Sequence, residues 1–270
     1  MPARSWRTIE KRTDEVQLLE ALRSNRTKRE RARRFVVEGV RNVDACLAAG
    51  WPVHAVLTVV GARLSRWAER VVSQVSAEAE RLQLAPDVFD LLTDREERPE
   101  LLLVAEIPRL LAEDVPRRND LLAVVLDRIA SPGNLGTIIR TADAFGADAV
   151  VTVGHAASPW DPQAVRASTG SLFAVPVVHV EGPDELLAWC RRRSATIVAT
   201  DEAADLDIAD APIDRPCALL LGNETVGLSR ALRELADVAV RIPIGGTASS
   251  LNVAVAAGIA LHELARRHRS

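Results

Sequence analysis

The sequence has few of the features that mark a membrane or secreted protein. No apolar run approaches the ~20 residues that a membrane-spanning helix needs, and the first fifteen residues contain no apolar signal core. We therefore expect a cytoplasmic protein with no membrane partner. The three cysteines, Cys46, Cys190 and Cys217, lie far apart and lack metal-ligand spacing. We expect them to be reduced thiols in or near the core.

The common nucleotide and metal motifs are also absent. The sequence has no G-K-[ST] segment of a P-loop, and the turn "SPGNLG" at residues 131–136 gives G-x-x-G instead of G-x-G-x-x-G. No H-E-x-x-H segment or Cys/His cluster indicates zinc, so we expect no metal. A nicotinamide-dependent dehydrogenase would suit an α/β pattern, but its fingerprint is missing.

Charge is concentrated near the N-terminus. The whole chain has a formal charge of −3, whereas residues 21–41 contain eight basic and two acidic residues, a net charge of +6. A charge run alone is most simply a solvated helix face. The high content of arginine, whose planar guanidinium grips phosphate, favours a nucleic-acid contact. We expect the RNA-binding residues of this segment to be Arg29, Arg31, Arg33 and Arg34.

The first half of the chain predicts a small domain. Residues 1–34 look helical and polar, without an apolar stripe. Residues 35–112 alternate between strand-like and helical runs, which predicts an α/β domain. Within it we expect strands near 34–39, 53–60 and 101–108 and helices over 40–50 and 63–82. Prolines and charges over residues 113–120 indicate a linker.

A second alternating series fills residues 121–270. The strand-like runs are 121–127, 147–154, 173–180, 195–201, 217–222 and 238–244. Nearly continuous apolar strands separated by helices predict a parallel sheet that helices cover on both faces. The expected fold class is therefore α/β in both domains.

Three polar, glycine-bearing loops each follow a predicted strand. They contain "NLGTIIR" (134–140), "LGNETVGLS" (221–229) and "IPIGGTASSLNVAVA" (242–256). Ligands of open parallel sheets bind beyond the carboxyl ends of the strands, so the loops predict one shared site. Each also has a simpler explanation: Asn134 suits a helix N-cap, Arg140 could pair with Asp143, and Glu224 could be a surface acid. Their joint order is harder to explain in this way.

These motifs resemble the three signature motifs of the SpoU (TrmH) family of RNA ribose 2′-O-methyltransferases, within the SPOUT superfamily. The resemblance covers about residues 121–267. A weaker one covers the segment "NRTKRERARRFVVEGVRNVDACLAAG" (25–50), which is similar to the start of the family's substrate-binding domain, a fold shared with kink-turn-binding ribosomal proteins. One departure is Ile244, where the family commonly has methionine.

The resemblance implies a deep trefoil knot near the C-terminus, an exception to the rule that chains do not thread loops. It implies a homodimer formed by the C-terminal domain, with active sites near the subunit interface. It also implies S-adenosylmethionine as cofactor, held by Gly222, Ile242 and Leu251. Leu221 and Ile244 are the apolar neighbours that we add to this set.

For catalysis, the resemblance implies that Arg140 activates the ribose 2′-hydroxyl. A guanidinium is almost never a free base at neutral pH. We therefore favour a role in which Arg140 holds the phosphate and stabilises the developing alkoxide, over one in which it loses a proton. Asn134 would orient Arg140 or the target nucleotide, and Glu224 would hold the loop or Arg140. We expect the remaining substrate-side residues to be Ser250 and Asn252.

Three kinds of function stay open at this point. The first is methylation of RNA, with rRNA preferred, and with tRNA methylation or a self-protecting rRNA methylation in an antibiotic producer as alternatives. The second is a non-catalytic RNA-binding protein of ribosome assembly, for which the basic segment would suffice. The third, a dehydrogenase, predicts binding of NADH, which we expect to be absent.

Overall fold

The structure is a computed structural model that describes residues 5–94 and 97–268. The chain forms two compact units. Unit 1 comprises residues 1–109 together with 160–174, and unit 2 comprises residues 110–159 together with 175–270. Among the described residues, no helix has the length and apolar character needed to cross a membrane.

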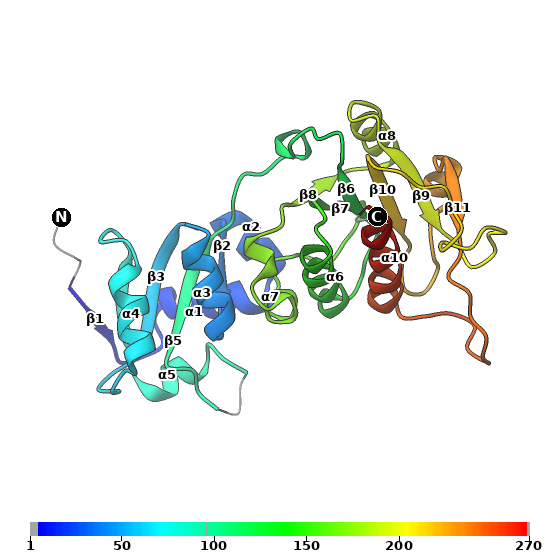
Figure 1. Ribbon diagram of the computed structural model, residues 1–270. Coiled ribbons are helices and arrows are strands. Elements are labelled where there is room, and N and C mark those ends of the chain that lie inside the picture. Colours follow the sequence, from blue (N-terminus) through cyan, green and yellow to red (C-terminus); the bar gives the residue numbers. More distant parts are fainter. Residues whose placement is uncertain (1–4, 95–96, 269–270) are drawn as a thin grey trace. The chain divides into compact units, whose positions relative to one another are not determined.

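Unit 1 is built on a five-stranded mixed sheet (Figure 1). The strand order is β1 (Arg7–Ile9), β4 (Glu80–Leu84), β3 (Val53–Val59), β5 (Leu101–Glu106) and β2 (Arg34–Val37). Strands β1, β4 and β3 pair in parallel, and β5 runs antiparallel to both of its neighbours. Its helices are α1 (Asp14–Ser24), α2 (Arg26–Ala32), α3 (Val40–Ala48), α4 (Arg66–Gln74), α5 (Pro86–Asp90) and α7 (Pro162–Ser168), with the short helix η2 (Ser171–Phe173).

The prediction of a polar N-terminal segment without an apolar stripe was wrong. Val16, Leu19 and Leu22 recur at helical spacing on α1 and are buried in the core of unit 1. Residues 7–9 also add strand β1 to the sheet. Residues 7–34 are therefore part of the domain that we expected to begin at Phe35.

The helix predicted over residues 63–82 is also divided. Helix α4 ends at Gln74, and strand β4 begins at Glu80. Arg81 lies inside β4 but is only 6% exposed, because its guanidinium donates to the backbone carbonyls of Val72, Val75 and Ser76 at the end of α4. A buried arginine breaks the apolar pattern by which a strand is recognised.

Unit 2 is built on a six-stranded, all-parallel sheet, as predicted. The strand order is β11 (Val238–Val240), β9 (Thr196–Thr200), β10 (Cys217–Leu221), β6 (Leu122–Asp127), β7 (Ala149–Val153) and β8 (Val177–Val180). Its helices are α6 (Pro132–Ala144), α8 (Pro183–Arg191), α9 (Arg230–Glu234) and α10 (Val253–His268), with the short helix η1 (Ala112–Asp114). Strand β11 ends at Val240, so most of the predicted strand 238–244 is loop.

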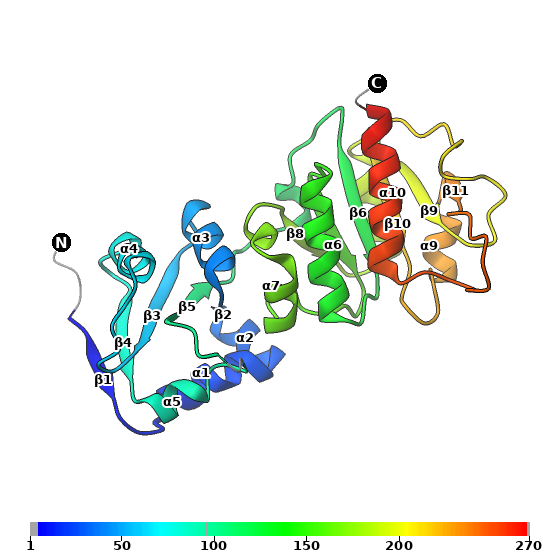
Figure 2. The ribbon, with the colours of Figure 1, turned by 60° about the horizontal axis from the view of Figure 1, so that its bottom comes forward.

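Helices cover the sheet of unit 2 on both faces. Leu186 and Trp189 of α8 and Leu232 of α9 are buried in one cluster with alternate strand residues such as Val125 and Val151. Helices α6 and α10 lie side by side across the opposite face (Figure 2). The central strands therefore have no polar face, and their polar groups gather at the strand ends.

The predicted linker is partly anchored to unit 2. Ala112 and Val115 are buried. The Trp189 indole donates to the Ala112 carbonyl at 2.7 Å, and the Arg193 guanidinium donates to the carbonyls of Ala112 and Val115. Arg193 also lies over the Trp189 ring, 4.3 Å from its centroid. This part of the chain follows the surface of unit 2 as a fixed segment.

The three cysteines are free and buried, as predicted. Burial raises the pKa of the Cys46 and Cys190 thiols to about 12 and that of Cys217 to about 11. They are therefore protonated at neutral pH and have no nucleophilic character.

Candidate active site

Three loops that carry or directly precede the predicted motifs meet at one edge of unit 2, but the first motif, residues 134–140, lies within helix α6 and is not itself a loop. Strands β6, β10 and β11 are parallel, and each ends directly before one of these loops. The loops then enter α6, α9 and α10, respectively. Because carboxyl ends of parallel strands share an edge, residues about 120 positions apart in sequence become neighbours.

A chain of hydrogen bonds connects the three loops. The Asn134 side-chain amide donates to the Glu224 carboxylate at 3.1 Å, and its oxygen accepts from the Asn252 amide at 3.2 Å. Asn252 in turn caps α10, because its side-chain oxygen accepts from the backbone N–H groups of Ala254 and Val255. Asn134 and Asn252 therefore hold neighbouring segments together, and Asn252 also caps its own helix.

Glu224 serves as the hub of this chain. Besides Asn134, its carboxylate accepts from the backbone N–H groups of Ala130 and Ser131, at 3.1 and 3.0 Å. Burial alone would raise the pKa of Glu224, but the hydrogen bonds that its carboxylate accepts outweigh burial and lower the pKa below 4.5. The group is ionised at neutral pH, and its lone pairs are committed to the loop before α6.

Gly222 is required by its own loop. A Cβ atom there would lie 2.3 Å from both the carbonyl carbon of Gly227 and the nitrogen of Leu228. Asn223 and Gly227 close this loop with two backbone hydrogen bonds, of 3.1 and 2.9 Å. Close packing against Gly227 and Leu228 is therefore the first reason for glycine at this position, in addition to the cofactor contact that the resemblance implies.

Sequence reasoning missed a second support at the end of β6. Asp127 is only 3% exposed and accepts from the Ser229 backbone N–H at 2.6 Å. It also binds the Arg128 guanidinium, which extends to the Gly227 carbonyl at 3.4 Å. The Asn223 amide donates back to the Arg128 carbonyl at 2.8 Å. A charged pair directly after an apolar strand, as in "VVLDR", was the available signal.

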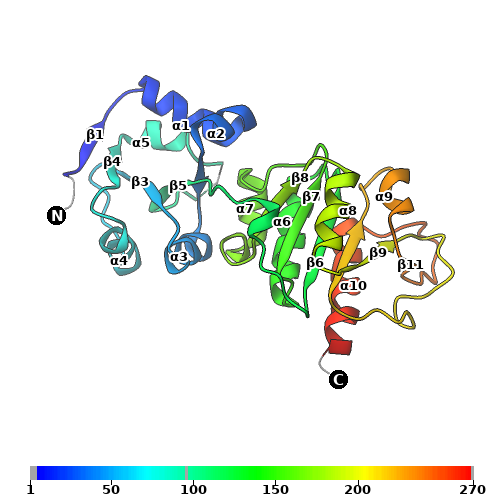
Figure 3. The same ribbon diagram turned by 90° about the horizontal axis from the view of Figure 1, so that it is seen from above.

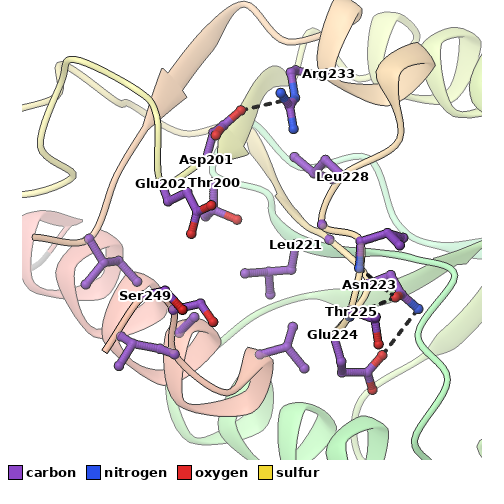
Figure 4. Close-up of a pocket in the computed structure, with 18 of the residues that line it drawn as sticks. Thr200, Asp201, Glu202, Leu221, Asn223, Glu224, Thr225, Leu228, Arg233 and Ser249 are labelled. Carbon is purple, nitrogen blue, oxygen red and sulfur yellow. Dashed lines mark hydrogen bonds and ion pairs between the residues drawn. The ribbon is translucent and has the colours of Figure 1, made fainter. Parts of the chain in front are cut away.

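A cavity of about 460 Å³ opens beside these loops (Figure 4). The predicted residues that line it are Leu221, Gly222, Glu224, Ile242, Ile244, Ser250 and Leu251. The main lining residues that the sequence did not suggest are Thr200, Asp201, Glu202, Arg233, Val253 and Ala256. The cavity thus combines apolar walls, backbone groups from two loops and a few charged side chains, as small-molecule sites do.

Arg140 stands apart from this network. It lies on α6, two turns beyond Asn134, with an exposed side chain. Within the part of the chain that the structure describes, its guanidinium makes no hydrogen bond or ion pair, so the structure does not support the simpler explanation that Arg140 pairs with Asp143. The partners of Asn134 and Glu224 are other residues. The structure therefore does not join Arg140 to either of them.

The predicted RNA-binding arginines of unit 1 differ in exposure. Arg31 is exposed, and Arg33 and Arg34 are partly exposed. Arg33 also donates to the Ile107 carbonyl. Arg29, in contrast, is only 2% exposed.

Arg29 is a structural residue, and its assignment to RNA binding does not fit this geometry. Its guanidinium donates to the carbonyls of Leu22 and Arg23 and forms a 3.0 Å ion pair with Asp161. Burial lowers the pKa of Arg29, and the Asp161 carboxylate opposes this effect. The buried guanidinium has no face left for a phosphate.

Among the described residues, no group of three or more histidine, cysteine or acidic side chains is placed to hold a metal ion.

Comparison with known proteins identifies this arrangement. Residues 121–262 match the model of the SpoU rRNA Methylase family, and residues 14–103 match that of the SpoU L30e-like domain. The chain is 43% identical over 270 residues to a 23S rRNA (uridine(2479)-2′-O)-methyltransferase of Streptomyces viridochromogenes, covering 98% of this chain and 93% of the relative. It is 32% identical over 243 residues to the Bacillus subtilis 23S rRNA (guanosine(2553)-2′-O)-methyltransferase RlmP, covering 88% and 92%.

Solved structures agree with these relatives. The SpoU methyltransferase AviRb from Streptomyces viridochromogenes, in complex with the cofactor AdoMet, superposes with a TM-score of 0.90 at 44% identity, covering 96% of this chain and 99% of that one. The AdoMet-bound rRNA methyltransferase from Sinorhizobium meliloti gives 0.88 at 33% identity, covering 97% and 98%. The two-domain α/β architecture and both motif-based resemblances are thereby confirmed, and the chain belongs to the SpoU rRNA methylase family.

Proposed function

We propose that this protein transfers a methyl group from S-adenosylmethionine to a ribose 2′-hydroxyl of 23S rRNA. The observation that carries the proposal is the hydrogen-bond chain of Glu224, Asn134 and Asn252, which fixes three loops beside a cavity of about 460 Å³. The AdoMet-bound relatives with the same fold support the cofactor, and the names of the relatives support the substrate.

The residues around the cavity fit this cofactor. Leu221, Ile242, Ile244 and Leu251 supply apolar surface for a purine and a methionine chain. Gly222 also lines the cavity, where its backbone can contact the ligand. S-adenosylmethionine supplies an electrophilic methyl group on a positively charged sulfur. Transfer therefore needs an aligned nucleophile and a site that excludes competing ones.

The polar residues have separate roles in the methyl transfer. In the transfer, a bond forms between the ribose oxygen and the methyl carbon while the carbon–sulfur bond breaks, and the hydroxyl proton leaves to phosphate or water. Arg140, whose exposed guanidinium has no partner in the described chain, binds the RNA phosphate and stabilises negative charge on the ribose oxygen. Glu224 and Asn134 position the loops, because their hydrogen-bonding groups are already occupied.

Unit 1 provides the second RNA contact in this proposal. Arg31, Arg33 and Arg34 lie at the end of α2 and the start of β2 with exposed or partly exposed side chains. The match of residues 14–103 to the SpoU L30e-like domain supports an RNA-binding role for this unit. Ser250 and Asn252 lie on exposed parts of the third loop and complete the substrate side of unit 2.

We take a uridine as the first candidate for the target base. The uridine-specific relative is 43% identical and aligns with 98% of this chain, whereas the guanosine-specific RlmP is 32% identical over 88%. Methylation of tRNA and a self-protecting role in an antibiotic producer remain the alternatives within the same chemistry.

Assembly and location complete the proposal. We propose a cytoplasmic homodimer formed through unit 2. An apolar pair one turn apart on α10, Val255 and Ile259, is 51% and 38% exposed, which supports an interface on that face. We also propose the trefoil knot expected for the family near the C-terminus, and the approach of Asn252 to Asn134 supports a threaded third loop.

Methyl transfer tests the proposal directly. Methyl-labelled S-adenosylmethionine is incubated with 23S rRNA, 16S rRNA, intact ribosomal subunits or bulk tRNA, in parallel with Arg140→Ala. We expect label in 23S rRNA, at a uridine, and a loss of at least about a hundredfold in the variant. Arg230→Ala, which removes an arginine that is 92% exposed on α9, is the matched control and should retain activity.

The other outcomes separate the alternatives. Label in tRNA would keep the chemistry and replace the substrate. Cofactor binding without label in any RNA would point to an untested substrate, whereas RNA binding with no cofactor binding at all would favour the non-catalytic ribosome-assembly protein.

A further inference from the structure

The cavity of unit 2 contains charged groups that the methyltransferase motifs do not explain. Thr200 ends strand β9, and Asp201 and Glu202 follow it at the cavity wall. Arg233 of α9 lines the same cavity. These residues come from the carboxyl end of β9, a fourth strand that contributes none of the three motif loops.

Asp201 and Glu202 differ in how they are bound. The Asp201 carboxylate pairs with the Arg233 guanidinium at 3.1 Å and accepts from the Ala203 backbone N–H at 3.0 Å. Glu202 is exposed and, among the described residues, has no hydrogen bond or ion pair. Figure 4 shows Glu202 beside Thr200, on the side of the cavity away from Asn223 and Glu224. Glu202 therefore presents an uncompensated negative charge to the cavity.

The charged side chains that line the cavity also sum to a net negative charge. Its lining holds three carboxylates, Asp201, Glu202 and Glu224, and one guanidinium, Arg233, a formal charge of −2. Arg233 offsets Asp201, and several N–H groups surround Glu224. Glu202 is thus the lining charge whose field is least compensated.

The two ligands that such a site must distinguish differ by one charge. S-adenosylmethionine has an ammonium, a sulfonium and one carboxylate at neutral pH, a net single positive charge. S-adenosylhomocysteine, the product, has a neutral thioether sulfur and no net charge. An acidic cavity with apolar walls attracts the first more than the second, because the walls limit screening by water.

We propose that Glu202 makes the cavity selective for the sulfonium cofactor over the thioether product, through its charge. This inference rests on the proposed function and deepens it. After methyl transfer the sulfur loses its positive charge, so the attraction of Glu202 disappears at the moment when the product has to leave. Glu202 thereby favours exchange of product for fresh cofactor and requires no movement of the loops.

Binding calorimetry on the full-length protein tests this role without any methyl transfer. The ligands are S-adenosylmethionine, S-adenosylhomocysteine and sinefungin, which has an ammonium group in place of the methylated sulfur. For Glu202→Gln we expect the affinity for both cations to fall about three- to tenfold, with the affinity for the neutral product changed by less than about twofold. Higher salt should reduce the selectivity of the parent more than that of the variant.

Glu181→Gln is the matched control. Glu181 follows β8, four strands away from β9, and is 91% exposed. Its removal should leave all three affinities unchanged. An equal loss for all three ligands in Glu202→Gln, or no change in any, would overturn the role of its charge while leaving the methyltransferase proposal intact. A parent protein that binds none of the three ligands would overturn both.

Discussion

The two units use polar residues in opposite ways, although the sequence presents both sets as candidates for function. In unit 1, Arg29 lies in the middle of a basic segment and is buried, with its guanidinium bound to Asp161 and two carbonyls. In unit 2, Glu224, Asn134 and Asn252 lie at the open edge of the sheet and bind one another. A run of charged residues in the sequence therefore does not show which of their side chains face outward. A position at the carboxyl end of a parallel strand does show that a residue lies at an accessible edge.

The strongest test of this contrast is removal of the Arg29 side chain. We expect Arg29→Ala to lower the free energy of unfolding of unit 1 by about 3 kcal/mol, because Asp161 loses its partner and two buried carbonyls lose their donor. Arg31→Ala, on the same helix but exposed, should cost less than about 0.5 kcal/mol. Urea unfolding followed by tryptophan fluorescence compares them, and equal costs would contradict the structural role of Arg29.

A second test is the addition of one methyl group at the cavity. Gly222→Ala places a Cβ 2.3 Å from the backbone of Gly227 and Leu228, so the second loop has to shift. We expect cofactor affinity to fall at least about tenfold, at a stability cost of about 1–3 kcal/mol from overpacking.

Gly246→Ala is the control for that substitution, since a Cβ there meets nothing within 4 Å. Calorimetry with S-adenosylmethionine provides the measurement. Unchanged affinity in Gly222→Ala would show that the cofactor does not depend on the shape of this loop.

The exposed arginines of unit 1 give a smaller, graded effect. If Arg31 and Arg34 contact phosphates, each alanine substitution should weaken RNA binding at low salt and reduce the slope of log affinity against log salt by roughly 0.7 to 0.9. Cofactor affinity should not change. Filter binding at several salt concentrations measures the slope, and a slope equal to that of the parent would remove the residue from the RNA surface.

The smallest expected effect concerns pH. The pKa of Glu224 is lowered in the folded protein, so its ionised form stabilises the fold at pH values above its ordinary pKa of 4.5. This contribution is lost as pH falls through the folded pKa. Glu224→Gln should therefore be less stable than the parent near pH 7, by less than about 1 kcal/mol because the residue is exposed. The difference in stability between the parent and the variant should disappear below about pH 4.5. Thermal unfolding at several pH values measures it, and a difference that does not depend on pH would contradict the role of the ionised Glu224 carboxylate.

Much of unit 2 could be predicted because its signals are local. Each strand is an apolar run, each of the three motifs contains both glycine and asparagine, and parallel pairing brings the strand ends together by geometry. The cofactor-side residues Leu221, Gly222, Ile242 and Leu251 follow from this rule and line the cavity. The residues that were missed, Asp127, Asp201 and Glu202, also lie at or directly after strand ends, but they belong to none of the three motifs.

Unit 1 was harder to predict because its decisive contacts are distant in sequence. Arg29 and Asp161 lie 132 positions apart, and no periodicity connects them. Strand β4 was not predicted because Arg81 interrupts its apolar pattern. The Arg81 guanidinium is buried by donating to carbonyls of the preceding helix. Phe35 likewise packs on Trp160 and Phe173, whose position in the sequence suggests that they belong to unit 2.

The segment 160–174 therefore has a consequence for protein engineering. The chain passes between the two units three times, after residues 109, 159 and 174. Helix α7 of this segment packs against strand β2 of unit 1 (Figure 3). An N-terminal fragment that stops at residue 109 would lack Trp160, Asp161 and Phe173, with the aromatic contacts and the ion pair that they supply. A chimera that exchanges unit 1 between relatives has to exchange this short insert as well. The residues that fold together as unit 1 do not form one continuous stretch of the chain.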